Sequence, residues 1–198
     1  MPIRYAHDTM PVPDLAEFRR TLRKVQRLRE RLRGEVDIEA LKEQGLEIGN
    51  NVYVAPWVLI DPVAAYLISI GDGSRLAPRV HILAHDATSR EALGFTRLAP
   101  VHIGCRVFLG ADTLVLPGVN IGDDTVIGAG SLVSSDIPPG SLAVGRPARV
   151  VGQSVDFFDR RKSRIDAGLR YGLSDAATPE GRARMRREIE EAGEGYIP

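Results

Sequence analysis

IGCRVFLGADTLVLPGVNIGDDTVIGAGSLV, residues 103–133, is the stretch of sequence that decides the fold. Within it an aliphatic residue returns at every sixth position, and a glycine or another small residue follows most of these positions. The aliphatic positions are Ile103, Leu109, Val115, Ile121, Ile127 and Val133. Four residues after each of them stands a second compact residue: Val107, Thr113, Val119, Thr125, Ser131 and Ile137. Such self-similarity at a fixed period is typical of a repeat architecture.

The same register extends toward the N-terminus, at Ile48, Val54, Ile60, Ile70, Leu76 and Ile82. A period of six fits neither the 3.6-residue period of a helix nor the two-residue period of a strand. It fits a short strand followed by a turn, so that three units close one triangular coil and the twelve units make about four coils. We therefore predict a mainly β fold, a parallel β-helix whose aliphatic and compact positions point inward and are buried by stacking. The recurring glycines are expected at tight corners that need a positive φ.

Two breaks interrupt the register. The step from Ile60 to Ile70 is four residues too long, and the step from Ile82 to Ile103 is fifteen too long. The second break predicts an extruded loop over residues 86–100, with His85 at its root. Loops on a rigid scaffold are where binding and catalytic residues concentrate, so this loop is the first place to look for a site.

The two ends of the chain are predicted to be helical. Residues 14–33 carry apolar side chains at three-and-four spacing, which indicates an amphipathic helix, and a short helix is expected over residues 37–44. Residues 153–170 and 178–192 are also expected to be helical, the latter beginning with Thr178 and Pro179 as cap and first-turn residues. This gives three segments: a helical one over 1–45, the β-helix domain over 46–152 and a helical one over 153–198. The helices are expected to cover the open ends of the β-helix.

Composition narrows the function. The 198 residues carry a formal net charge of zero, and no basic patch marks the repeat region, so no nucleic-acid partner is expected. No apolar run approaches 18 residues and the start lacks a signal-peptide pattern, so no stable membrane insertion is expected. The single cysteine, Cys105, has no internal disulfide partner. A cytoplasmic location fits these features.

The segments IGDGSRLAPRVHILAHD (70–86) and IGCRVFLGADTLVLPGVNIGDDTVIGAGSLVSSDIPPGSLAVGRPARVVG (103–152) resemble the hexapeptide-repeat acyltransferases. The similarity is greatest to the O-acetyltransferases that modify sugars and surface polysaccharides, and it covers about 100 residues from near Ile48. The resemblance implies a left-handed β-helix, a homotrimer with active sites between neighbouring subunits, and transfer of an acyl group from acetyl-coenzyme A. No metal is implied.

His85 matches the catalytic histidine of this family by position. A coenzyme A thioester is already activated, so the enzyme needs only a base that takes the proton of the attacking hydroxyl or amine, and a positioned histidine suits this task. Asp86 is a candidate for orienting or charge-balancing the imidazole. Backbone N–H groups at the coil corners are expected to stabilise the developing oxyanion.

For the donor, the resemblance implies contacts from the backbone along successive coils and from basic residues near the last coil. The matching positions are Gly110, Ala111, Gly128, Ala129, Ser134, Ser135, Arg146 and Arg149. The repeat region holds seven arginines and no lysine, and two of the arginines follow the final coil. Because arginine pairs bidentately with phosphate, Arg149 and Arg146 are the candidates for the nucleotide phosphates. The alternative is that they cap the last coil by bonding carbonyls.

The acceptor pocket is expected to include Trp57, which either stacks on a sugar ring or packs beneath the N-terminal helix. Asp61, at the first break, is a candidate hydroxyl-binding carboxylate, and Phe95 and Thr96 in the loop are candidates for closing over the acceptor. The predicted reaction is acetylation of a sugar or glycan-precursor hydroxyl with His85 as general base.

Other functions stay open. An amino-sugar nitrogen or a xenobiotic is the second choice of acceptor, and a non-enzymatic trimeric scaffold is the alternative to an enzyme. A γ-type carbonic anhydrase has the same solenoid and requires three zinc-binding histidines, but the spacing of His81 and His85 does not match that family's pair. Cys105 as an acyl-enzyme nucleophile has no histidine in its own repeat unit.

Overall fold

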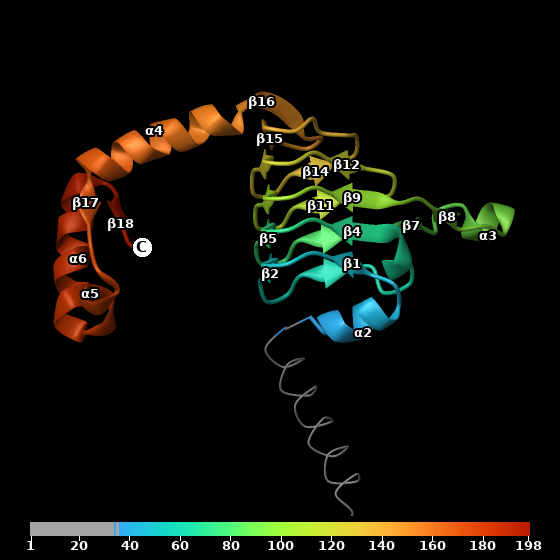
Figure 1. Cartoon of the computed structure of the whole chain (residues 1–198), viewed down its shortest axis with the longest axis horizontal. Coiled ribbons are helices and arrows are strands. Elements are labelled where there is room, and N and C mark those ends of the chain that lie inside the picture. The colour runs from blue at the N-terminus through green and yellow to red at the C-terminus, as the bar shows by residue number, and fades with distance from the viewer. Residues whose placement is uncertain (1–33, 35) are drawn as a thin grey trace, which may run out of the picture.

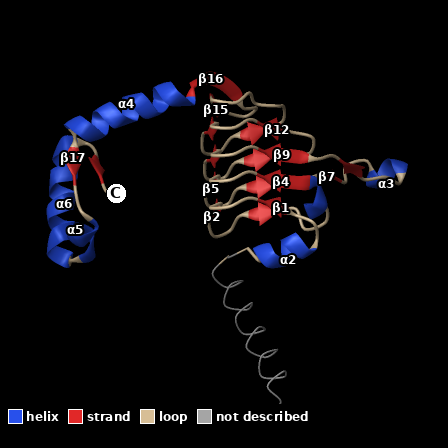
Figure 2. Cartoon of the chain, viewed as in Figure 1, coloured by secondary structure: helices blue, strands red, loops and turns tan. Residues whose placement is uncertain are grey.

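The computed structural model describes residue 34 and residues 36–198 of the chain, and the helix predicted over 14–33 lies outside these described residues. The central part is a stack of short parallel strands that wind as a prism with three faces (Figures 1 and 2). Four complete coils and a partial fifth follow one another, so the predicted parallel β-helix of about four coils is confirmed.

Each face of the prism is one parallel ladder. The first face consists of β1 (Glu47–Ile48), β4 (Ile68–Ile70), β9 (Val101–Ile103) and β12 (Asn120–Ile121). The second face consists of β2 (Tyr53–Val54), β5 (Arg75–Leu76), β10 (Phe108–Leu109), β13 (Val126–Ile127) and β15 (Ser141–Val144). The third face consists of β3 (Leu59–Ile60), β6 (His81–Ile82), β11 (Leu114–Val115) and β14 (Leu132–Val133).

The six-residue pattern fills the inside of the prism. Fully buried aliphatic side chains come from all three faces, and the first coil alone keeps some exposure, at Ile48 and Val54. Full burial of one such side chain stabilises the fold by roughly 1.5–3 kcal/mol. The compact positions that are polar bury their hydroxyls with partners: Ser131 Oγ, for example, donates to the carbonyl of Gly128 at 2.6 Å. A buried hydroxyl without such a partner destabilises the fold, which explains why serine and threonine are tolerated there.

The repeat glycines serve a purpose other than the predicted one. A Cβ on Gly110 would lie 2.4 Å from the backbone nitrogen of Ala129, and one on Gly122 would lie 2.4 Å from that of Pro139, both in the next coil. Neither glycine has a positive φ. The left-handed residues follow two positions later and include Asp112 and Asp124. The glycines are therefore required by the close approach of stacked coils, and the prediction of a positive φ at these positions is wrong.

The two ends of the β-helix are closed differently. At the N-terminal end, α2 (Ile38–Glu43) lies beneath the first coil and buries Leu41, as predicted (Figure 1). At the other end, β16 (Arg149–Gln153) pairs antiparallel with β15 and closes the last coil. The expectation that helices cover this second end is wrong, because an open strand edge needs hydrogen-bond partners that another strand supplies.

The C-terminal residues leave the prism. The helix α4 (Ser154–Ala167) leads away from the coils to α5 (Leu173–Ala177) and α6 (Pro179–Ala192), with β17 (Leu169–Arg170) and β18 (Gly195–Tyr196) paired in parallel beside them (Figure 1). The side chain of Thr178 accepts a hydrogen bond from the N–H of Gly181 at 3.0 Å and caps α6, as predicted. None of the helices in the described part of the chain has the length and apolar character needed to span a bilayer.

Candidate active site

Both breaks in the repeat leave the prism at the same edge, where the third face turns into the first. The first break holds a 3-10 turn, η1 (Ala65–Leu67), before β4. The second forms an arm in which β7 (His85–Asp86) pairs antiparallel with β8 (Arg97–Leu98) and α3 (Arg90–Leu93) lies at the far end. Figure 1 shows this arm projecting outward from the coils, so the predicted extruded loop is confirmed and His85 lies at its root.

His85 is held by a buried carboxylate. The Nδ1 atom of its ring lies 2.5 Å from Oδ2 of Asp61, and the same oxygen accepts the backbone N–H groups of His85 and Ala84, both at 3.0 Å. The other carboxylate oxygen accepts the N–H of Val63 at 3.0 Å. Asp61 is fully buried, whereas the His85 side chain is 29% exposed, so one edge of the imidazole is oriented from inside and the other is open.

The charge of Asp61 fixes the tautomer of His85. Burial by itself raises the pKa of the Asp61 carboxyl, but the hydrogen bonds from His85 and from the backbone of Ala84 and Val63 outweigh it and leave the pKa below its usual value. An ionised carboxylate only accepts hydrogen bonds, so Nδ1 carries the hydrogen and Nε2 carries the lone pair. This is the arrangement of a general base with an orienting carboxylate.

Asp86 does not hydrogen-bond to the imidazole; of its predicted role, only an electrostatic interaction with His85 is present. Its Oδ1 accepts the backbone N–H of Thr88 at 2.9 Å, and hydrogen bonds from the backbone and side chain of Thr88 hold the pKa of Asp86 below its usual value. The carboxylate that contacts the imidazole comes instead from Asp61, which was expected to bind the acceptor. Asp61 is buried with both of its oxygens occupied, so it has no free position for a substrate hydroxyl.

His85 opens into a groove of about 570 Å³ between the arm and the third face. One side of the groove consists of residues that follow the third-face strands. From the arm, Arg97 of β8 donates a hydrogen bond to the carbonyl of Pro117 at 3.2 Å. Leu83, Leu116 and Pro117 give the groove an apolar wall, and Ser134 contributes a hydroxyl. Arg97 was not among the predicted site residues; its place becomes apparent only when β7 and β8 are paired.

The predicted donor-binding residues fall on two edges of the prism. Ser134 and Ser135 are exposed and follow β14 on the edge that carries His85, and Ser134 lines the groove. The others lie where the second face turns into the third, after β10, β13 and β15: Gly110, Ala111, Gly128, Ala129 and Arg146. Within one chain, Ser134 therefore shares the groove with His85, Ser135 follows it on the same edge, and the remaining positions lie on a separate edge.

The two arginines after the last coil differ in their contacts. Arg149 begins β16, and its Nη1 donates to the carbonyl of Ala148 at 2.9 Å, which matches the capping alternative for this residue. Arg146 is exposed on the turn between β15 and β16; the pKa of Asp112 lies below its usual value mainly because Arg79 hydrogen-bonds to it, and the nearby Arg146 adds to this. Arg146 is therefore freer than Arg149 to hydrogen-bond to a phosphate.

The remaining predicted acceptor residues lie away from His85 within one chain. Trp57 follows β2 on the edge between the second and third faces; its ring lies against Gly34, where a Cβ would come within 2.2 Å of it. The N-terminal helix of the packing alternative lies outside the described residues, so the choice between packing and stacking on a sugar stays a prediction. Phe95 is 78% exposed on the arm and its carbonyl accepts from Ser89 Oγ, and neither Phe95 nor Thr96 lines the groove.

The other candidate side chains are separated by the prism. His81 is exposed on the third face and His102 on the first, which confirms that both face outward. Cys105 lies on the edge between the first and second faces, where its backbone N–H donates to Asp123. Among the residues that the structure describes, no three histidine, cysteine or acidic side chains come together in a metal-binding group.

Comparison with known proteins agrees with this fold. Residues 100–135 match the family model described as bacterial transferase hexapeptide (six repeats). Galactoside O-acetyltransferase of Escherichia coli (strain K12) is 38% identical over 118 residues, which is 56% of this chain and 55% of that protein. A protein of Staphylococcus aureus (strain COL), provisionally named an acetyltransferase, is 57% identical over 58 residues, 29% of either chain. The chain thus spans about half or less of the length of these relatives.

Among solved structures, the hexapeptide-repeat acetyltransferase VCA0836 of Vibrio cholerae, determined with acetyl-coenzyme A, superposes with a TM-score of 0.53. It is 22% identical, and the match covers 73% of this chain and 92% of that one. The fold is therefore the left-handed parallel β-helix that the sequence analysis predicted. The predicted resemblance to the hexapeptide-repeat acetyltransferases is thus confirmed.

Proposed function

We propose that this protein transfers an acetyl group from acetyl-coenzyme A to a hydroxyl of a sugar or glycan precursor, with His85 as the general base. The observation that carries the proposal is the pair of Asp61 and His85 at the mouth of the groove, with Nδ1 bonded to a buried carboxylate and the other side of the ring open. A relative named galactoside O-acetyltransferase supports the choice of a sugar hydroxyl.

In this mechanism the acceptor hydroxyl attacks the thioester carbonyl while Nε2 of His85 takes its proton. The new C–O bond forms, the carbonyl oxygen becomes negative, and the C–S bond then breaks as the imidazolium returns the proton to the thiolate of coenzyme A. The Asp61 carboxylate stabilises the imidazolium between these steps through the bond to Nδ1. A base placed in this way contributes roughly 10²–10⁴ to the rate.

The groove beside His85 suits the pantetheine arm of the donor. Its apolar wall fits the methylene chain, and the hydroxyl of Ser134 is available to the amides. The candidate coenzyme A-binding residues on the other edge include Gly110, Gly128 and Arg146. They contact the same coenzyme A molecule only if a neighbouring subunit places its copy of that edge beside the groove. The adenosine phosphates are then bound by Arg146, with Arg149 beside it.

The outward side chains also support a homotrimer. On the second face the outward row of the ladder is apolar apart from Arg75, with Tyr53 and Phe108 exposed and Leu142 partly exposed. Leu59 is an exposed apolar residue on the third face. On the first face the row is polar. Burial of the apolar rows between copies removes them from water and places the second–third edge of one copy against the His85 edge of the next. Three chains of 21.6 kDa are expected by light scattering.

The test is thiol release from acetyl-coenzyme A over a panel of sugars, nucleotide sugars and amino sugars. With an accepted sugar, His85→Ala is expected to lower kcat by roughly 10²–10⁴. Cys105→Ala, the matched control for an acyl-enzyme route, is expected to keep the wild-type rate because Cys105 lies on another edge. Full activity of His85→Ala removes it as the base. No turnover together with no coenzyme A binding by calorimetry favours the scaffold, and turnover of amino sugars alone favours N-acetylation. Since acetyl-coenzyme A is a cytoplasmic metabolite, the proposal places the reaction in the cytoplasm.

A further inference from the structure

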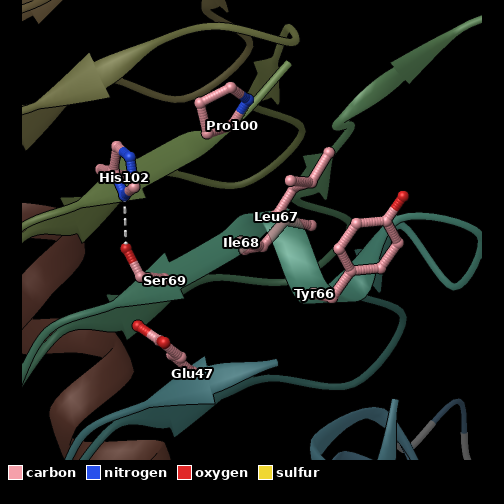
Figure 3. Close-up of a pocket in the computed structure, with 7 residues that line it drawn as sticks. All are labelled: Glu47, Tyr66, Leu67, Ile68, Ser69, Pro100 and His102. Carbon is pink, nitrogen blue, oxygen red and sulfur yellow. Dashed lines mark hydrogen bonds between the residues drawn. The ribbon is translucent and has the colours of Figure 1, made fainter. Parts of the chain in front are cut away.

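A second groove, of about 200 Å³, lies on the first face of the prism, and none of the residues lining it is part of the site described above. Figure 3 shows Glu47, Ser69 and His102 on adjacent strands, one above the other, with Tyr66 to one side and Pro100 above. The two side walls come from the two breaks in the repeat: Tyr66 belongs to η1, and Pro100 ends the arm.

Three polar groups are arranged in a row along this groove. Glu47 pairs with Ser69 in the ladder and Ser69 pairs with His102, so their side chains repeat at the strand spacing of about 4.8 Å. Ser69 Oγ lies 2.7 Å from Nδ1 of His102 (Figure 3). The carboxylate of Glu47 is exposed and has no hydrogen-bond or ion-pair partner within the described part of the chain. The row therefore offers a carboxylate, a hydroxyl and an imidazole to solvent.

The wall beside the row is aromatic. The side chain of Tyr66 is 56% exposed although it belongs to a short turn directly against the buried core of the first two coils. An exposed aromatic face next to a row of hydrogen-bonding groups is suited to a pyranose, whose C–H face packs on a ring while its hydroxyls donate to a carboxylate and exchange hydrogen bonds with an imidazole or hydroxyl. A purely apolar ligand would desolvate the three polar groups and leave the Glu47 carboxylate unpaired, which is unfavourable.

This groove begins within a few residues of His85. In the arm, His85 pairs with Leu98, and the N–H of Ala99 donates to the carbonyl of Ala84 at 3.0 Å. Pro100, the next residue, lies in the wall of the second groove. The root of the arm thus lies between the two grooves. One is lined by His85 and an apolar wall, and the other by the polar groups and Tyr66.

We propose that the first-face groove binds a sugar unit of the acceptor next to the unit whose hydroxyl reacts at His85. This inference rests on the proposed function and extends it: the acceptor is an oligosaccharide or a glycan end, and its recognition requires Tyr66, Ser69, His102 and Glu47. Neither Ser69 nor His102 is a catalytic residue in this scheme.

The kinetic test compares a monosaccharide acceptor with the disaccharide and trisaccharide that end in the same sugar. In the wild type, kcat/KM is expected to rise about tenfold from the monosaccharide to the disaccharide. Tyr66→Ala is expected to remove that gain and to leave kcat/KM for the monosaccharide within twofold, and Glu47→Gln to reduce the gain about fivefold. Glu43→Gln, the matched loss of an exposed charge four residues away, is expected to keep the wild-type gain. Equal gains in Tyr66→Ala and the wild type overturn the proposal.

Binding without turnover separates this inference from the proposed function. Saturation-transfer NMR with maltotriose, cellotriose and chitotriose reports contact whether or not acetylation occurs. A trisaccharide that binds the wild type and loses most of its saturation transfer in Tyr66→Ala supports the groove even if the wild type acetylates no sugar. If none of the three binds, or if one binds equally well to Tyr66→Ala and His102→Gln, the groove is not a sugar site. Thermal unfolding of the variants, whose altered side chains lie at the surface, verifies that they are folded.

Discussion

Replacing Asp61 with asparagine removes one negative charge from the centre of the candidate site and changes almost nothing in shape. In the structure Oδ2 of Asp61 accepts three N–H groups, two from the backbone of Ala84 and His85 and one from the imidazole. The amide oxygen of the introduced side chain must occupy that position, because an NH2 group there faces three donors. The NH2 group then faces the N–H of Val63, which lies 3.0 Å from the other carboxylate oxygen and loses its acceptor.

The size of the effect on catalysis follows from this geometry. A hydrogen bond to a charged group contributes about 1.5–3 kcal/mol and one between neutral groups about 0.5–1.5 kcal/mol. The imidazolium that forms in the reaction is therefore less stabilised by roughly 1–2 kcal/mol in Asp61→Asn, and about 1.4 kcal/mol corresponds to a factor of ten in rate. In molecules in which the introduced amide is flipped, its NH2 group faces Nδ1, which then has no acceptor. The hydrogen of the imidazole can move to Nε2, and the rate falls further. We expect kcat to fall about tenfold to a hundredfold.

The assay is steady-state thiol release with saturating acetyl-coenzyme A and an accepted sugar, together with thermal unfolding of each variant. KM for the sugar is expected to change less than threefold, since Asp61 is buried and touches no substrate. Asp86→Asn is the matched control: it removes a neighbouring carboxylate that bonds Thr88, and it is expected to change kcat less than threefold. The reasoning is refuted if Asp61→Asn turns over at the wild-type rate, or if Asp86→Asn loses as much activity as Asp61→Asn.

Four further predictions concern stability and donor binding. Leu109→Ala empties a fully buried position in the middle of the stack and is expected to lower the free energy of unfolding by about 2–5 kcal/mol in urea titrations; a loss below about 1 kcal/mol contradicts the packed interior described here. Gly110→Ala is expected to lower the melting temperature more than Gly152→Ala. A Cβ on Gly110 meets the backbone of Ala129, whereas a Cβ on Gly152 has no heavy atom within 4 Å. Equal melting temperatures of the two variants would contradict a close contact between the coils at Gly110. The folded-state pKa of Asp61 lies below its unfolded value, so the carboxylate stabilises the fold above pH values near 4 and this contribution disappears as the pH falls through the folded pKa. The difference in stability between the wild type and Asp61→Asn should therefore narrow on acidification below about pH 4, and a gap that widens there reverses the assigned direction. Arg146→Ala is expected to weaken coenzyme A binding in calorimetry more than it weakens binding of the dephosphorylated pantetheine, and an equal effect on both ligands excludes a phosphate contact.

The coils could be predicted because the repeat constrains the interior at every sixth residue. An aliphatic side chain at Leu109 or Ile127 has no alternative environment once Val115 and Val133 are placed on the next face, so position and orientation follow from the period alone. The role of the glycines could not be read in the same way. A glycine that turns the chain and a glycine that allows two backbones to approach look alike in sequence, and only the contact of Gly110 with Ala129 separates the two.

The strand that closes the C-terminal end of the β-helix could not be predicted from the sequence pattern, for a different reason. Residues 149–153 break the six-residue period and contain no strong alternation, so they give no signal of a strand. They form β16 because β15 has an open edge on the last coil, and hydrogen bonding to that edge is a tertiary effect. The helices of the same region were predictable, since the Thr178 cap and Pro179 act within one turn of α6.

The partner of His85 was within reach of the sequence, given register arithmetic. Ile60 and Ile82 pair on the third face, so the residues that follow them lie on the same edge one coil apart. Asp61 is therefore stacked next to the backbone that leads into His85, even though 24 residues separate the two in the chain. When the breaks after Ile60 and Ile82 are treated as separate insertions, Asp61 is assigned to the substrate and Asp86 to orienting His85, whereas in the structure Asp61 makes the hydrogen bond to Nδ1.

Both breaks in the repeat lie at this one edge, and this explains how a uniform solenoid acquires a localised site. A coil corner that keeps the period presents the backbone and single side chains paired from coil to coil, such as Arg79 with Asp112 and Arg106 with Asp124. Extra residues at the third–first edge supply what the repeat cannot: a buried acid, a partly exposed base on a pinned arm, and the aromatic wall of a second groove from Tyr66. The insertions leave the inward positions of β4 and β9 in register, so the core tolerates them. In a chain of this kind, the positions at which the period fails are the ones to search for chemistry.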